Sequence, residues 1–173
     1  MTEFLSLIIA FIALLATIWE LRENRDYNKI SIRPLLVITQ HFGGSQGRYG
    51  IAVKNAGLGP AIINKCEVTI GSNKMKENDG DHGWNAAKKE LKLKRPIELI
   101  ESKVAPNGKI AHGDRIWLLY IGDKSINNEN IVEVQNAIKN SGLDVKINYE
   151  SMFGEPFTEV FLKKERRRQN NLF

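Results

Sequence analysis

The sequence predicts a mainly β domain with one or two short helices, preceded by a single N-terminal transmembrane helix. Three observations lead to this prediction. An uncharged apolar run occupies residues 4–19. From residue 34 onward, short runs rich in β-branched residues alternate with turns that contain Gly or Pro. The clearest helical pattern in that part, residues 128–142, ends on a glycine.

The composition is that of one globular domain with a short appendage. The chain has 173 residues, 42% hydrophobic and 26% charged, which is not the composition of a disordered chain. A single cysteine, Cys66, cannot form an internal disulfide, in keeping with a reducing compartment. Residues 22–173 hold 25 basic and 18 acidic residues, a net charge of +7. No recognised nucleic-acid motif accompanies this charge, so we do not expect a nucleic-acid partner.

Residues 1–21 are predicted to form a transmembrane anchor, and residues 22–33 a juxtamembrane stalk. The run FLSLIIAFIALLATIW, Phe4–Trp19, has no charged residue. As a helix it would cover about 24 Å, less than the roughly 30 Å of a hydrocarbon core. Two alternatives stay open: a cleaved signal peptide, although a basic n-region is missing, and a helix buried in a soluble core.

Basic residues determine the predicted orientation. Arg22, Arg25, Lys29 and Arg33 follow the apolar run, and no Lys or Arg precedes it. The positive-inside rule then predicts a single-pass protein of the inner (cytoplasmic) membrane, with its N-terminus outside and its C-terminal domain in the cytosol.

A second group of basic residues lies near the end of the chain, where residues 164–173 form a basic tail after the predicted domain. Near a membrane such residues attract anionic lipid, and the alternative is a solvated terminus. The residues expected to contact lipid are Arg22, Arg25, Lys29, Lys163, Lys164, Arg166, Arg167 and Arg168.

Small residues share one face of the N-terminal helix. Ser6, Ala10, Ala13 and Thr17 are spaced four, three and four residues apart. A stripe of small side chains lets membrane helices approach closely, so it predicts self-association into a homo-oligomer.

The domain predicted over residues 34–163 consists of hairpins with one polar insertion. Its strands are expected where apolar or alternating runs lie between turn residues. The expected elements are a hairpin over LLVITQHF and RYGIAVKNAG, a strand over 61–70, an insertion over 71–97 with a short helix at AAKKELKL, strands over IELIESKV and RIWLLYIG, a helix over 128–140 closed by Gly142, and a final hairpin over LDVKINYES and FTEVF.

The segment VKNAGLGPA resembles the V-x-N-x-G-x-G-P-A signature of bacterial immunoglobulin-like β-sandwich modules. APNGKIAHGDRIWLLYI resembles their proline/glycine turn and following strand, and YESMFGEPFTEVF resembles their closing hairpin. The resemblance implies an antiparallel sandwich in a membrane-anchored bacterial protein, with a binding or scaffolding role and no catalytic residue. The turn that it implies consists of Asn55, Gly57, Gly59 and Pro60.

Side chains that could carry chemistry form no recognised pattern. The three histidines are His41, His82 and His112, and two of them lie in the acidic turns DGDHG and HGD. A group of Asp79, Asp81, His82, His112 and Asp114 has the ligand types for a divalent metal, but not the spacing of a structural zinc site. We therefore expect no catalytic residue, metal or cofactor.

Three functions are consistent with these observations. The first is a membrane-tethered, non-enzymatic interaction or scaffold module that presents a cytoplasmic β-sandwich to a protein partner. The second is a self-assembling membrane effector, of a defence or toxin type, that oligomerises through its transmembrane helix. The third, a metal-dependent membrane-bound enzyme, would use the Asp/His turns.

Overall fold

Two compact units make up the chain, residues Met1–Arg33 and Pro34–Phe173, and each is described by itself. The computed structural model describes residues 2–43, 47–71, 73–75, 82–105 and 107–161.

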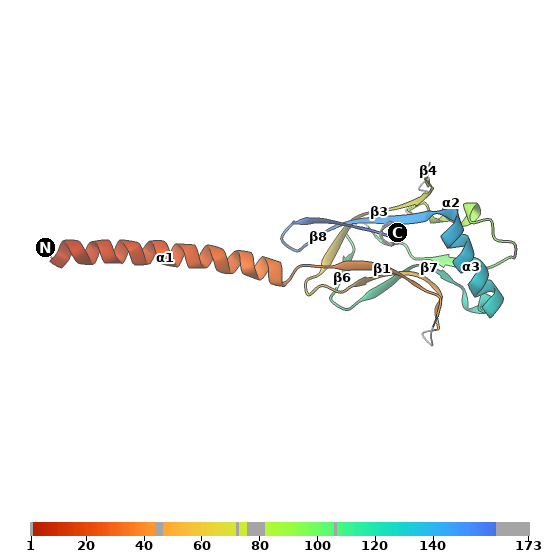
Figure 1. The fold of residues 1–173 in the computed structure, drawn as a ribbon, viewed down its shortest axis with the longest axis horizontal. Helices are drawn as coiled ribbons and strands as arrows, with labels where there is room; N and C mark the ends of the chain where they lie inside the picture. Colours follow the sequence, from red (N-terminus) through yellow and green to blue (C-terminus); the bar gives the residue numbers. More distant parts are fainter. Residues whose placement is uncertain (1, 44–46, 72, 76–81, 106, 162–173) are drawn as a thin grey trace, which may run out of the picture. The chain divides into compact units, whose positions relative to one another are not determined.

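The first unit is one continuous helix, α1 (Thr2–Ser31), drawn in red to orange in Figure 1. The sequence favours it because Leu, Ala, Glu and Arg are good helix formers and neither Gly nor Pro interrupts them. The helix stops shortly before Pro34, which lacks a backbone donor and disfavours helical conformation in the residue before it. α1 therefore covers residues 2–21 of the predicted anchor and residues 22–31 of the predicted stalk.

The predicted transmembrane helix is contradicted by the structure. Within the described ranges, no helix is long and apolar enough to cross a membrane. The uncharged run of α1 corresponds to about 24 Å of helix, and charged residues begin again at Glu20. The single-pass topology and the orientation derived from it lose their basis.

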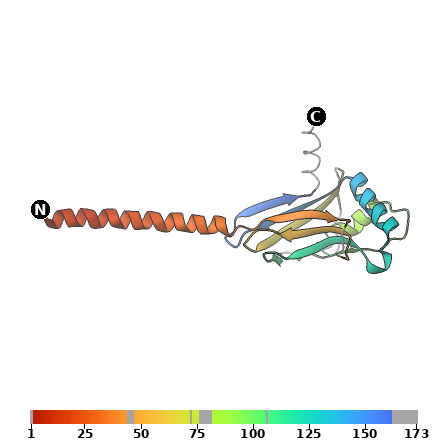
Figure 2. The same cartoon turned by 60° about the horizontal axis from the view of Figure 1, so that its bottom comes forward.

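The second unit contains two antiparallel sheets (Figures 1 and 2). Sheet A has the strand order β1-β2-β7-β5. Its strands are β1 (Leu36–His41), β2 (Gly50–Asn55), β7 (Arg115–Ile121) and β5 (Leu99–Glu101). Between β2 and β7 the register shifts, because Ile51 pairs with Leu119 and Ala52 with Trp117. Leu118 is therefore the extra residue of a β-bulge.

Sheet B follows the order β4-β3-β8-β9, and β6 pairs with β3 as well. Its strands are β3 (Ala61–Ile70), β8 (Leu143–Glu150), β9 (Pro156–Val160), β4 (Asn73–Lys74) and β6 (Lys109–Ile110). The β3–β8 pairing runs from Ile62↔Glu150 to Ile70↔Leu143. β8 shows the alternation of a strand with one covered face, since Leu143, Val145, Ile147 and Tyr149 are buried.

One hydrophobic core lies between the sheets, which is the arrangement of a β-sandwich. Both sheets contribute, for example through Ile51 and Val53 of sheet A and Ile63 and Ile147 of sheet B. Two helices extend the core at one end of the sandwich, α2 (Trp84–Glu90) and α3 (Asn128–Ser141) (Figures 1 and 2). A short 3-10 helix, η1 (Asp123–Ser125), precedes α3.

The C-terminal cap of α3 is the one that the sequence predicted, and the structure adds an N-terminal cap. The Asn127 side chain accepts a hydrogen bond from the backbone N–H of Asn130, and Gly142 takes the left-handed conformation with φ 66°. Ile131, Val134 and Ile138, one helical face, are buried. This helix was identified correctly because its signals are local.

The expectation of a mainly β chain is wrong, since the fold is a mixture of α and β. α1 alone has 30 residues and α3 has 14. The insertion expected over 71–97 contains a short helix, as predicted, and α2 places Trp84 fully inside the core. The strand expected over IELIESKV is reduced to the three residues of β5.

Candidate interaction surface on sheet A

The outer face of sheet A carries an aromatic cluster between basic side chains. Cross-strand pairing identifies this face, because paired residues point to the same side of a sheet. Leu36, Ile38, Ile51 and Val53 point inward and are buried, so their neighbours along the strands point outward. The outward residues form three rows across β1, β2 and β7: His41, Gly50 and Tyr120; Thr39, Ala52 and Trp117; Val37, Lys54 and Arg115.

Two rings meet over the middle strand. His41 on β1 and Trp117 on β7 stand two strands apart, a backbone separation of about 10 Å. Their ring centroids are nevertheless only 5.4 Å apart, in an edge-to-face arrangement. The contact is possible because β2 offers only Gly50 and Ala52 beneath the rings. Ala52 has no exposed surface although it points outward, as expected for a residue that the rings cover.

Gly50 is required by the backbone as well. A Cβ at this position would lie 2.0 Å from the carbonyl oxygen of Leu119 on β7. Any side chain would therefore push β2 and β7 apart beside the bulge, and with them the strands that hold the rings.

The cluster continues to Tyr120 and Arg48. The Trp117 and Tyr120 rings also pack edge to face, with centroids 6.3 Å apart. The Arg48 guanidinium lies over the Tyr120 ring, 5.0 Å from its centroid, at the distance of a cation–π contact. Thr39 Oγ1 and His41 Nε2 are 2.9 Å apart, so a hydrogen bond fixes the imidazole at the other end of the cluster.

The charged side chains on this face are positive. Lys54 and Arg115 are direct cross-strand neighbours, and Arg48 lies beyond Tyr120. The outward rows of these three fully described strands contain no carboxylate. Burial, and after it the positive charge of Arg115, lowers the pKa of His41, so its imidazole is neutral at pH 7.

We call the set His41, Arg48, Lys54, Arg115, Trp117 and Tyr120 the aromatic–basic face. It presents partly exposed rings, with Arg48 over Tyr120 and the Lys54–Arg115 pair in the row next to Trp117. Trp, Tyr and Arg are the residues most enriched among the energetic centres of protein interfaces. A face of this composition can bind a surface that has acidic side chains.

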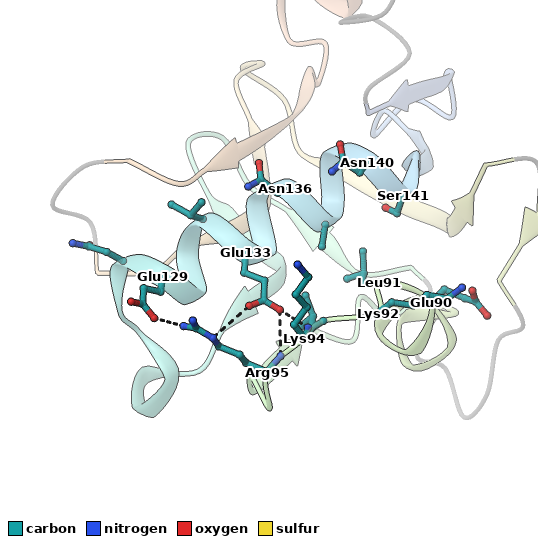
Figure 3. Close-up of a pocket in the computed structure, with 14 residues that line it drawn as sticks. Glu90, Leu91, Lys92, Lys94, Arg95, Glu129, Glu133, Asn136, Asn140 and Ser141 are labelled. Atoms are coloured by element: carbon teal, nitrogen blue, oxygen red, sulfur yellow. Dashed lines mark hydrogen bonds and ion pairs between the residues drawn. The ribbon is translucent and has the colours of Figure 1, made fainter.

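A groove lies elsewhere, between α3 and the segment that follows α2 (Figure 3). It has a volume of about 1040 Å³. Arg95 pairs with Glu129 and Glu133 of α3, and Glu133 also accepts hydrogen bonds from the backbone N–H groups of Lys94 and Arg95. The Glu129 carboxylate raises the pKa of the Arg95 guanidinium. These ion pairs and hydrogen bonds connect the segment after α2 to α3, so we interpret them as structural contacts.

The Asp/His group considered as a metal site is not assembled in the residues that the structure describes. Asp79 and Asp81 lie outside them. Buried His82 has its Nε2 2.6 Å from the carbonyl oxygen of Val104, and His112 Nδ1 lies 2.7 Å from that of Gly57. No three His, Cys, Asp or Glu side chains that are described could together hold a metal ion.

Asn55 organises the turn between β2 and β3, which contains the segment that resembles the signature of immunoglobulin-like modules. Its side chain is fully buried. Nδ2 donates to the carbonyl oxygens of Gly59 and Ile110, 2.8 and 2.9 Å away. Oδ1 accepts from the backbone N–H groups of Leu35 and Gly57. Pro60 follows at the exit, directly before β3.

The small-residue stripe lies on α1 and is exposed. The Ser6 hydroxyl donates to the carbonyl oxygen of Glu3 and the Thr17 hydroxyl to that of Ala13. Ala10 and Ala13 lie between them on the same face.

The residues predicted to contact lipid divide into two groups. Arg22 and Arg25 are exposed on α1, and partly buried Lys29 lies 3.9 Å from Asp26. Lys163, Lys164, Arg166, Arg167 and Arg168 lie outside the described residues. Lipid contact stays a prediction.

Comparison with known proteins places the chain in a family. The model of a domain of unknown function, DUF8453, matches residues 1–164. The chain belongs to the DUF8453 family. The match includes α1 as well as the sandwich, so the pattern of DUF8453 joins the apolar helix to the β domain. No curated protein and no solved structure matches the chain.

The aromatic–basic face of this DUF8453 chain was not found by sequence reasoning, which named His41 only as one of three histidines. A signal was present in GIAVK, where Gly50, Ala52 and Lys54 share one side of a strand. It could not be interpreted without knowing that β1 and β7 lie on either side of β2.

Proposed function

We propose that the chain is a non-enzymatic interaction module, and that its aromatic–basic face binds a protein partner with acidic side chains. One observation supports this above all: the His41 and Trp117 rings meet over β2 on the outside of the sandwich. They stand where a solvated sheet would carry polar side chains. Partly exposed aromatic rings in such a place gain apolar burial only when something covers them.

The charges favour an acidic partner. Lys54 and Arg115 are side by side on neighbouring strands, and like charges in direct cross-strand register destabilise a sheet. A carboxylate from a partner would lie near both cations and interact favourably with them. Charge complementarity of this kind mainly increases the association rate and the specificity, while the rings supply most of the affinity.

The test begins with capture of the partner. The tagged full-length chain is used to isolate a stoichiometric protein from an extract of its own cells, and calorimetry then measures the dissociation constant. Trp117→Ala is expected to raise this constant by about 30-fold, the loss of one interface hot spot. Lys54→Glu is expected to raise it by about tenfold and to make binding less sensitive to salt.

Matched controls separate the face from the rest of the surface. Phe153→Ala removes an exposed aromatic ring from the β8–β9 turn, and Lys109→Glu reverses an exposed charge on β6 of sheet B. Both variants should bind like the wild type. Unchanged affinity of folded Trp117→Ala and Lys54→Glu proteins would exclude this face as the binding site. Capture of nucleic acid in place of a protein would contradict the proposed partner.

A further inference from the structure

Large apolar side chains on α1 follow a heptad pattern. Six of them are separated by three, four, three, four and three residues, the spacing of alternating a and d positions in a coiled coil. Between 41% and 71% of each side chain is exposed. These six residues, which we call the seam, are Phe4, Leu7, Phe11, Leu14, Ile18 and Leu21.

A hollow of about 480 Å³ lies on the same side of the helix. In a coiled coil, a d side chain enters a hole formed by residues at a, d, e and the next a, and an a side chain enters a hole formed by d, g, a and the next d. In α1 the first hole corresponds to positions 4, 7, 8 and 11, and the second to 7, 10, 11 and 14. Together they give the residues that line the hollow: Phe4, Leu7, Ile8, Ala10, Phe11 and Leu14.

From this agreement we propose that α1 associates with α1 of a second copy of this chain through the seam. The seam carries the knobs and the holes on one face, so it is complementary to itself. The flanking e and g positions from residue 8 to 17 are Ile8, Ala10, Leu15 and Thr17, all uncharged. They hold no charges of the kind that would select a different partner helix or repel an identical one. Arg25 takes the next a position, so the seam ends at Leu21.

This interface differs from the small-residue stripe. Ser6, Ala13 and Thr17 do not line the hollow, and only Ala10 belongs to both sets. The two interfaces therefore respond to different substitutions. The inference is also independent of the aromatic–basic face, which lies in the other unit of the chain.

The experiment measures the protein mass of the purified full-length chain in aqueous buffer without detergent, by light scattering over a range of concentrations. The wild type should give a multiple of the monomer mass that decreases on dilution. Leu7→Ala with Leu14→Ala should raise the dissociation constant by at least about tenfold, because two knobs are removed from every copy. Circular dichroism should show an unchanged helix content, since Ala is the best helix former.

The control is Ile9→Ala with Ile12→Ala, which shortens two large side chains outside the seam. The exposed fractions are matched: 69% and 56% for Leu7 and Leu14, and 60% for both Ile9 and Ile12. This control and Ala13→Leu should associate like the wild type. The proposal is overturned by a wild type that is monomeric at every concentration, by equal weakening in both double variants, or by dissociation caused by Ala13→Leu.

Discussion

Asn55 shows how one polar side chain can hold a turn together. It is fully buried, and its amide uses both of its ends, accepting from Leu35 and Gly57 and donating to Gly59 and Ile110. The Ile110 carbonyl belongs to β6, so the same amide joins the β2–β3 turn to a distant strand. A shorter apolar residue would leave these backbone groups without a partner.

We expect Asn55→Ala to lower the free energy of unfolding by about 3 kcal/mol, because unpaired buried polar groups keep their full desolvation cost. Urea denaturation at neutral pH measures this loss. Asn64→Ala is the control, since exposed Asn64 only donates to Glu150 and should change stability by less than about 0.5 kcal/mol. Similar losses in the two variants would contradict the role assigned to Asn55.

His41 should make stability depend on pH. Burial and Arg115 lower the pKa of its imidazole below the usual 6.5, so the unfolded chain binds a proton at a higher pH than the folded chain. The contribution of His41 to the free energy of unfolding is then fully present above about pH 6.5. It decreases as the pH falls from there toward the pKa of the folded state. Unfolding free energies of the wild type and His41→Gln, compared between about pH 8 and pH 5.5, should show a smaller decrease for the variant. Parallel curves would disprove the contribution of His41.

At the level of single residues, sequence reasoning identifies what local chemistry determines. Asn55 was named because its motif is contiguous. Trp117 and Tyr120 were missed because His41 and Arg48, which contact them, are far away in the sequence. Their exposure also depends on which side of β7 faces the core. The bulge at Leu118 adds to the difficulty, because it shifts the alternation between Trp117 and Tyr120.

Among the elements, those defined by neighbours in sequence were predicted best. The bounds of β3 are the predicted ones, Ala61–Ile70, and α3 differs from its prediction by one residue at its end. α2 begins at Trp84, before the predicted AAKKELKL segment, and ends at Glu90. Its placement depends on the burial of Trp84, a tertiary effect that composition does not reveal.

The β2–β7 pair offers a prediction at the level of the element. Lys54→Glu places a carboxylate opposite Arg115, so a like-charge pair becomes an opposite-charge pair. We expect the sandwich to become more stable by about 0.5 kcal/mol while partner binding weakens. Thermal unfolding measures the effect of Lys54→Glu in the wild-type and in the Arg115→Gln background. The gain in stability should be absent in the second background, and the difference between the two effects is the energy of the pair. An equal gain in both backgrounds would show that the effect does not come from Arg115.

On the scale of the whole molecule, the two units differ in whether they bury their own apolar side chains. The buried hydrophobic residues described run from Leu36 to Phe161 and include none from α1. α1 instead exposes large apolar side chains along its length, from Phe4 to Ile30. A single helix has no interior in which to bury them, so its apolar face must find a partner outside its own unit. Sequence reasoning recognised that this helix needs burial, but it chose a membrane span, which the structure contradicts.

The division predicts that the sandwich folds without α1. A chain of residues 34–173 should have the same urea midpoint and the same m-value as the full-length protein, because it keeps every described core residue. Its mass should be that of a monomer at all concentrations, since the seam is absent. A lower midpoint would mean that α1 contributes to the stability of the sandwich. An unchanged midpoint together with persistent association would instead place the contact between copies in the second unit.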